Sequence, residues 1–106
     1  MESIHPILQS YIPVVQAIGA TMGKQCEVVL HQLTKEISTV IAIANGEVTG
    51  RKVGSPATDL LVEIAEALES DTVRDEMMLN YRNETPEGRI LKSSTVLVKD
   101  GDQVLG

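Results

Sequence analysis

Residues 45–59 read Asn45-Gly-Glu-Val-Thr-Gly-Arg-Lys-Val-Gly-Ser-Pro-Ala-Thr-Asp59, and this glycine-rich segment organises the sequence around it. The residues before it, Ile37–Ala44, are apolar and rich in β-branched side chains, which is typical of a strand. After it we predict a helix, with Ser55 as N-cap and Pro56 at the first helical position. A basic glycine-rich loop before a helix can bind an anion. Glycines can equally serve only to supply positive φ angles in a tight connection.

Length and composition predict one globular domain. The chain has 106 residues, of which 42% are hydrophobic and only 2% are aromatic. The core must therefore consist of aliphatic side chains, and base stacking by aromatic rings is almost excluded. A net charge of −6 argues against binding to a nucleic-acid backbone, which requires clustered basic side chains.

Cysteine usage and hydropathy give no sign of secretion, metal binding or membrane insertion. Cys26 is the only cysteine, so no internal disulfide is possible, and we expect it to be an inert core residue. No signal peptide and no apolar run of membrane-spanning length is present in the sequence. We therefore expect a cytoplasmic location.

The first part of the chain predicts a helix. Apolar residues recur at steps of three and four from Ser3 to Met22, with Ser3 as a predicted N-cap. Pro13 predicts a kink or a break into two helices, because it removes an interior hydrogen bond. Gly19 and Gly23 are expected to mark the end of this helix.

Two strands and a hairpin are expected next. Gln25–Leu33 alternates in a strand pattern that places His31 on one face with Val29, and the Thr34–Glu36 turn leads into the second strand. With so short a connection, the two strands should pair antiparallel.

The remainder predicts helices followed by further strands. We expect a helix from Ser55 and a second helix from Asp71 to about Met78. A short strand at Leu79–Arg82 and a turn at Asn83–Gly88 should follow. We then expect a strand at Arg89–Lys99, a hairpin turn at Asp100-Gly101 and a strand that begins at Gln103. Sequential strands joined by short turns imply an antiparallel sheet covered by helices, which is an α+β domain.

Four stretches resemble a known family. Glu27-Val-Val-Leu-His31, Ile43-Ala-Asn-Gly-Glu47, Thr49-Gly-Arg-Lys-Val-Gly-Ser-Pro-Ala-Thr-Asp59 and Gly88-Arg-Ile-Leu-Lys-Ser-Ser-Thr95 resemble the YheO-like PAS domain. The resemblance extends from about Tyr11 to Gly106. It implies the N-terminal sensor half of a bacterial transcriptional regulator, so residues 1–106 form one domain. The C-terminal helix-turn-helix domain of such regulators is absent from this chain.

The resemblance also implies a strand order. PAS-like folds have a five-stranded antiparallel sheet of order 2-1-5-4-3, with helices on one face. Here the fifth, central strand is expected to be truncated at Gly106. We expect that its stub still pairs with strands one and four, or that a second chain fills the gap.

Candidate ligand-binding residues follow from side-chain chemistry. A buried histidine can contact a ligand or simply hydrogen-bond a neighbour. A guanidinium suits a carboxylate or phosphate, although a salt bridge from Arg51 or Arg89 to Glu47, Asp59 or Glu87 is an equal alternative. The candidates are His31, Asn45, Gly46, Arg51, Ser55, Tyr81, Arg89, Ser94 and Thr95.

These residues favour a sensor without catalytic activity. We expect a small polar or anionic metabolite as ligand, a homodimer as the assembly, and contact with DNA only through the absent domain. A ligand-free dimerisation module, built on the apolar N-terminal helix, is the alternative. His31, Ser94 and Asp59 are the residue types of a hydrolytic triad. Neither Ser94 nor the adjacent Ser93 lies in a nucleophile elbow, however, so no catalytic residue is predicted. No cofactor or metal is expected, since no motif for haem, flavin or a metal is present.

Overall fold

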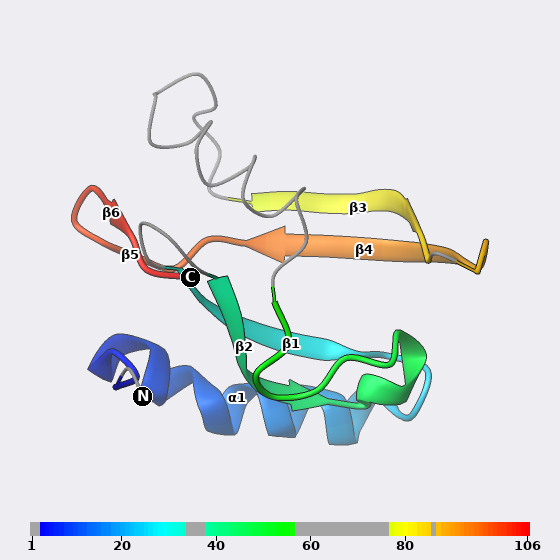
Figure 1. The fold of residues 1–106 in the computed structure, drawn as a ribbon, viewed down its shortest axis with the longest axis horizontal. Coiled ribbons are helices and arrows are strands. Elements are labelled where there is room, and N and C mark those ends of the chain that lie inside the picture. The colour runs from blue at the N-terminus through cyan, green and yellow to red at the C-terminus, as the bar shows by residue number, and fades with distance from the viewer. Residues whose placement is uncertain (1–2, 34–37, 57–76, 86) are drawn as a thin grey trace.

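The computed structural model describes residues 3–33, 38–56, 77–85 and 87–106 (Figure 1). Within these residues the fold has one α-helix and antiparallel strands, which is the α+β class expected. The elements are α1 (Pro6–Met22), β1 (Val28–Leu33), β2 (Ser38–Ala44), the 3₁₀-helix η1 (Gly46–Val48), β3 (Met77–Glu84), β4 (Ile90–Val96), β5 (Lys99–Asp100) and β6 (Gln103–Val104).

Helix α1 begins later than predicted and is continuous. His5, rather than Ser3, is the N-cap, and its Nδ1 accepts a hydrogen bond from the backbone N–H of Ile7 at 3.1 Å. The helix runs through Pro13, so the two-helix alternative is wrong. It ends at Gly23, as predicted.

Gly19 lies inside α1 rather than at its end. A Cβ atom at this position would collide with the Cβ of Ala44 on β2. Glycine costs about 1 kcal/mol relative to alanine within a helix. Here the missing side chain lets the backbone of α1 lie directly against the sheet.

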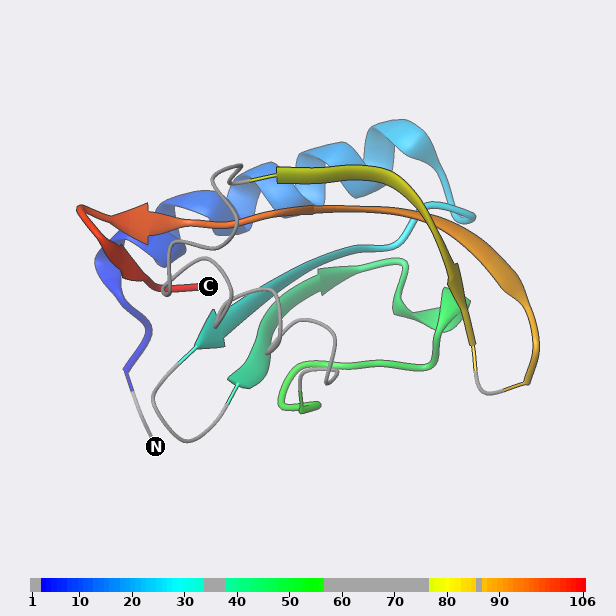
Figure 2. The ribbon, with the colours of Figure 1, turned by 90° about the horizontal axis from the view of Figure 1, so that it is seen from above.

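The main core lies between α1 and the β1–β2 pair (Figures 1 and 2). Leu8 is completely buried, because the side chains of both strands on this face meet the helix. The other members of the core are Val15, Leu30, Ala42, Val98 and Leu105. The last two belong to the C-terminal part of the chain, so they attach it to the same core.

Strands β1 and β2 form the predicted antiparallel hairpin. Val28 pairs with Ala44, and an irregularity in the register lies between Leu30 and His31. Leu30 belongs to the core beneath the sheet. His31 therefore projects from the opposite face, since successive side chains of a strand alternate. The turn predicted at Thr34–Glu36 lies outside the described residues.

Strand β3 is longer than predicted. It includes Met77 and Met78, which were expected to end a helix, and Asn83, which was expected in a turn. Methionine and leucine favour a helix by intrinsic propensity, but here each pairing with β4 supplies a cross-strand neighbour instead. Most of the two helices predicted from Ser55 and Asp71 falls within residues 57–76, outside the described part. At the start of the first, Pro56 forms an isolated antiparallel bridge with Thr39 of β2, so its prediction as the first helical position is wrong.

The last two residues of the chain form backbone hydrogen bonds with the end of β1 and with the segment that follows β4. Strands β5 and β6 form a hairpin where one was predicted, but its two-residue loop is Gly101-Asp102 rather than Asp100-Gly101, because Asp100 pairs with Gln103. The N–H of Leu33 donates to the carbonyl of Leu105 at 2.7 Å, and the N–H of Val98 donates to that of Gly106 at 3.0 Å. Among the described strands β6 itself pairs only with β5, so pairing of the stub with strands one and four stays a prediction. The strands themselves form three two-stranded sheets, so the five-strand order stays a prediction.

Candidate functional site

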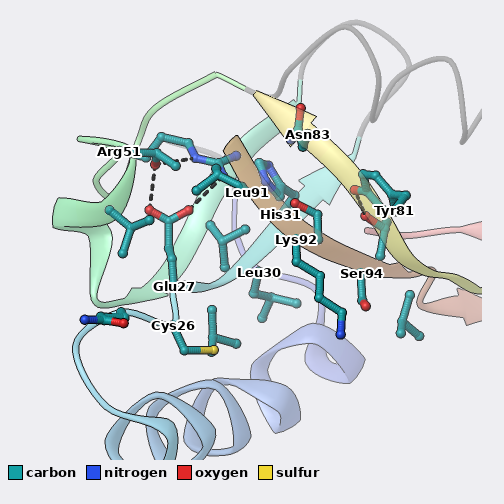
Figure 3. Close-up of a pocket in the computed structure, with 18 of the residues that line it drawn as sticks. Cys26, Glu27, Leu30, His31, Arg51, Tyr81, Asn83, Leu91, Lys92 and Ser94 are labelled. Carbon is teal, nitrogen blue, oxygen red and sulfur yellow. Dashed lines mark hydrogen bonds and ion pairs between the residues drawn. The ribbon is translucent and has the colours of Figure 1, made fainter. Parts of the chain in front are cut away.

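A cleft of about 660 Å³ lies between β1 and β4. Its walls come from the stretch around β1, from the loop after η1, from β3 and from the whole of β4 (Figure 3). Both His31 and its neighbour Leu30 belong to this lining, so β1 contributes consecutive residues to the cleft. The cleft is the candidate site because most of the predicted ligand-binding residues meet there.

A buried ion pair connects the loop after η1 to the residue before β1. Arg51 Nη2 lies 2.7 Å from Glu27 Oε2, and the side chain of Glu27 is only 7% exposed. The hydroxyl of Thr49 donates to Glu27 Oε1 at 2.6 Å and accepts from Arg51 Nε at 3.0 Å. The partner of Arg51 is thus Glu27, and not one of the acidic residues considered from the sequence. This network fixes the loop against the cleft.

His31 is a buried polar group with an unused atom. Its side chain lies between Arg51 and Tyr81 in Figure 3, and the residue is 7% exposed. In the described part of the chain, its Nδ1 is the one buried side-chain nitrogen or oxygen without a hydrogen-bond partner. Burial, and then the positive charge of Arg51, lower the pKa of His31 from 6.5 to about 4. The imidazole is therefore neutral at physiological pH.

This lowered pKa makes folding stability depend on pH. The unfolded chain binds a proton at His31 near pH 6.5 and the folded chain only near pH 4, so acidification through this window favours unfolding. Between pH 7 and pH 5 we expect a loss of about 2 kcal/mol in the free energy of unfolding, measured by urea denaturation. His31→Gln should remove this component of the pH dependence. If the free energy of unfolding depended equally on pH in the wild type and in His31→Gln, this expectation would be contradicted.

Hydroxyl groups of β4 are already engaged with β3. The Tyr81 and Thr95 hydroxyls lie 2.7 Å apart, and the Ser94 hydroxyl accepts from the backbone N–H of Asn80 at 3.1 Å. Asn80 has a positive φ of 57° at the irregularity in this ladder. The Ser94 hydroxyl therefore replaces a backbone partner there, which is a structural role.

Six of the nine predicted ligand-binding residues line the cleft, and three do not. Those on the cleft are His31, Arg51, Tyr81, Arg89, Ser94 and Thr95. Contact of any of them with a ligand stays a prediction. The cleft brings together residues more than sixty positions apart in the sequence, because β4 lies opposite β1.

The three predicted residues outside the cleft lining have visible structural roles. Asn45 Nδ2 lies within 2.8–3.0 Å of the carbonyls of Gly19, Gly23 and Cys26. Gly46 lies against the backbone of Arg51, where a Cβ would collide with the Arg51 carbonyl oxygen. The Ser55 hydroxyl accepts from the N–H of Lys52. The loop thus folds on itself.

Glu27, Thr49 and Asn83 line the cleft but were not among the predicted site residues. The signal for Glu27 was present in the sequence, because it lies four residues before His31 on the same face of a strand. Among the described residues that line the cleft, three side chains are cationic, those of Arg51, Arg89 and Lys92, and one is a carboxylate, that of Glu27. The charge of this described lining is thus opposite in sign to the net charge of the chain.

Metal and membrane features are not found in the part of the chain that the structure describes. There, no group of three or more histidine, cysteine, aspartate or glutamate side chains is placed to hold a metal ion. Cys26, predicted to be a core residue, is a free, half-buried thiol beside the cleft. No helix in the same ranges has the length and hydropathy required to cross a membrane.

Comparison with known proteins gives one family and several bacterial relatives. The family model described as "YheO-like PAS domain" matches residues 2–106. A protein of Escherichia coli K12 described as "Uncharacterized protein YheO" is 39% identical over 98 residues, covering 92% of this chain and 40% of that protein. An "Uncharacterized protein" of Haemophilus influenzae is 34% identical over 97 residues, with 92% and 42% covered. This chain thus spans about two fifths of these relatives. No solved structure matches significantly.

Proposed function

This chain belongs to the family of YheO-like PAS domains, and from that premise we propose that it is the ligand-sensing domain of a cytoplasmic bacterial transcriptional regulator. Its ligand is a small anionic or polar metabolite bound in the cleft between β1 and β4. DNA is contacted only by a separate helix-turn-helix domain of the regulator. Binding changes the relative populations of two conformations or dimer arrangements.

The observation that carries this proposal is the buried His31 side chain with its unpartnered Nδ1. A buried polar atom without a partner is unfavourable, and a ligand that supplies the missing hydrogen bond would relieve that cost. The surplus of cationic side chains around it favours a carboxylate or another oxyanion. Neither feature suggests a reaction, so the proposal is a sensor without catalytic activity.

Thermal-shift screening with amino acids, organic acids and nucleotides tests the proposal. A ligand present well above its dissociation constant raises the melting temperature, since it binds only the folded state. We expect a hit among the anionic compounds, and we expect Arg89→Gln to weaken its effect. Lys52→Gln is the matched control, because it removes one exposed positive charge away from the cleft.

Three outcomes would count against this proposal. A complete screen without a stabilising compound argues against a sensor, and an equal loss in Arg89→Gln and Lys52→Gln argues against this cleft. Chemical turnover of a hit would indicate an enzyme.

A homodimerisation module without a ligand is the second candidate, and the surface of α1 favours it. The helix has 17 residues and no charged side chain. Tyr11, Val14, Ile18 and Met22 are 42–64% exposed and recur at steps of three and four, so they form one apolar stripe. Such a stripe can pack against the same stripe of a second copy.

Sedimentation of α1 variants tests this second candidate. Ile18→Glu places a charge in the stripe and should convert a dimer to a monomer. Gln9→Glu places the same charge on an exposed part of α1 outside the stripe and should have no effect. A monomeric wild-type chain at all concentrations would reject dimerisation through α1.

We further infer that the strands follow the PAS order 2-1-5-4-3. The strand of β6, continued by Leu105 and Gly106, takes the fifth and central place in this order. The hydrogen bonds from this segment to Leu33 and to Val98 support that assignment.

A further inference from the structure

One asparagine of the sequence, Asn45, is followed by a glycine, and the pair lies at the start of η1. Asparagine is among the thermally labile residues, because the backbone nitrogen of the next residue can attack its side-chain amide carbon. Glycine hinders this attack least, since it has no side chain. The other two asparagines, Asn80 and Asn83, precede larger residues. Asn45 is therefore the asparagine of this chain with the greatest intrinsic reactivity.

The reaction at this pair releases ammonia and then consumes water. The Gly46 nitrogen gives up its proton and forms a bond to Asn45 Cγ, while the bond from Cγ to Nδ2 breaks and Nδ2 leaves as ammonia. The product is a succinimide ring. Water opens this ring at either carbonyl, which gives aspartate or isoaspartate at position 45. In isoaspartate the backbone runs through the former side chain.

The fold keeps the two reacting groups apart. With a ψ of 40° at Asn45, the tetrahedral geometry of its Cα places the Gly46 nitrogen nearly anti to Cβ across the Cα–C bond. Attack on Cγ requires this nitrogen to be nearly eclipsed with Cβ, so the peptide must first rotate. Hydrogen bonds oppose that rotation, because the Asn45 carbonyl accepts from Val48 at 3.3 Å and the Gly46 carbonyl accepts from Gly50 at 2.7 Å.

The amide that would leave is also held in place. Asn45 Nδ2 lies 3.0 Å from the carbonyl oxygen of Gly19, 2.9 Å from that of Gly23 and 2.8 Å from that of Cys26. These contacts fix the side chain against the end of α1. The reaction therefore requires the loop of residues 45–51 to open and the amide to leave all three carbonyls.

The products do not fit the closed loop. Both carry a carboxylate in place of the amide, and a carboxylate has no proton to donate at neutral pH. Its oxygens would meet the carbonyl oxygens that now bind Nδ2, so acceptors would face acceptors in a partly buried position. Isoaspartate also adds a methylene group to the backbone at the first residue of the loop. After the reaction the loop cannot close in its original form.

We propose that Asn45 is a self-modification site that limits the lifetime of the folded domain. Transient opening of the 45–51 loop lets Gly46 attack the amide, and the loss of ammonia makes the opening permanent. A local opening equilibrium thereby becomes an irreversible loss, whose rate follows how often this loop opens. The proposal concerns the attachment of the loop to α1, so it does not rest on the proposed ligand.

Peptide mapping by mass spectrometry during incubation at mildly alkaline pH tests the protection of the amide. The folded chain is compared with a peptide that has the sequence of residues 43–52, because this peptide keeps the reacting groups and lacks the contacts with α1. We expect position 45 to lose its amide at least about tenfold more slowly in the folded chain. Equal rates in the two samples would overturn the proposal.

Two threonine variants test whether opening of this loop controls the rate. Thr49→Val removes the hydroxyl that donates to Glu27 at 2.6 Å, and so loosens the 45–51 loop. Thr95→Val is the matched control, because its hydroxyl pairs with that of Tyr81 and joins β4 to β3. We expect faster loss of the amide in Thr49→Val alone. Equal rates in the two variants would overturn the dependence on this loop. If Thr49→Val does not fold, the comparison with the peptide decides.

The stability of the modified chain tests whether the change is permanent. Anion exchange separates this chain, because the reaction adds a negative charge. We expect its melting temperature at neutral pH, followed by circular dichroism, to be lower by at least about 5 °C. Asn45→Gly has no amide to lose and should give no such fraction during the same incubation. A modified chain that melts with the unmodified one would show that the loop closes around the carboxylate, and would overturn the proposal.

Discussion

Arg51→Met is expected to lower the free energy of unfolding by about 3 kcal/mol at pH 7. The substitution leaves the Glu27 carboxylate, whose side chain is 7% exposed, with the Thr49 hydroxyl as its remaining hydrogen-bond partner among the described residues. Removing one partner of a buried pair is costly because the other charge stays desolvated. Urea denaturation of the variant and the wild type measures the loss.

A double substitution separates the ion pair from other effects of losing Arg51. In Glu27→Gln/Arg51→Met no buried charge remains, and we expect this protein to be more stable than Arg51→Met alone. Additive losses from the two single substitutions would show that the pair is not coupled. Arg51→Met also removes a positive charge that lowers the pKa of His31. The pKa of His31 in the folded state should therefore rise toward 6.5 in this variant, so the loss of stability on acidification that is due to His31 should be smaller than in the wild type.

The elements that sequence analysis predicted correctly are those whose signal is local. Alternating apolar residues defined β1 and β2, and the Asp100-Gly101 signal located the last hairpin to within one residue, because a two-residue turn leaves few other structures. Gly23 likewise ends α1 as expected. In each case the residues that determine the structure are neighbours in the sequence.

The predictions were wrong where contacts with residues distant in the sequence determine the local structure. His5 replaces Ser3 as N-cap while its backbone N–H donates to Gln32, a residue of β1. Gly19 was interpreted as a helix end, yet its small size is required by Ala44 on β2. Met77 and Met78 extend a strand because β4 offers partners. No local pattern contains these contacts.

The candidate site follows the same rule. His31 and Arg51 were predicted from their chemistry, and both line the cleft. The acidic partner of Arg51 was not predicted, because Glu27 lies 24 positions away in the sequence. Asn45 was predicted as a ligand contact because it lies in the glycine-rich loop, but its side-chain amide is turned toward the end of α1.

Asn45→Asp is the second substitution with a large expected effect, a loss of about 3 kcal/mol in unfolding free energy at neutral pH. Asn45 Nδ2 lies 3.0, 2.9 and 2.8 Å from the carbonyl oxygens of Gly19, Gly23 and Cys26. Aspartate has nearly the same shape, but it places a negatively charged oxygen against three acceptors. This arrangement raises the pKa of the introduced carboxyl, so the loss should shrink as the pH falls and a proton becomes available for donation.

Substitutions of Asn45 by glycine and by alanine separate the contribution of the side-chain amide to stability from that of the backbone conformation. Asn45 has φ of 59°, in the left-handed region that glycine adopts freely and alanine does not. Asn45→Gly should therefore cost only the lost hydrogen bonds, and Asn45→Ala about 1 kcal/mol more. The amide holds the end of α1 against the start of β1 and the end of β2, so its loss loosens the support of one cleft wall. If Asn45→Asp were as stable as the wild type, the three carbonyls would need another donor, and the proposed role of Asn45 would be wrong.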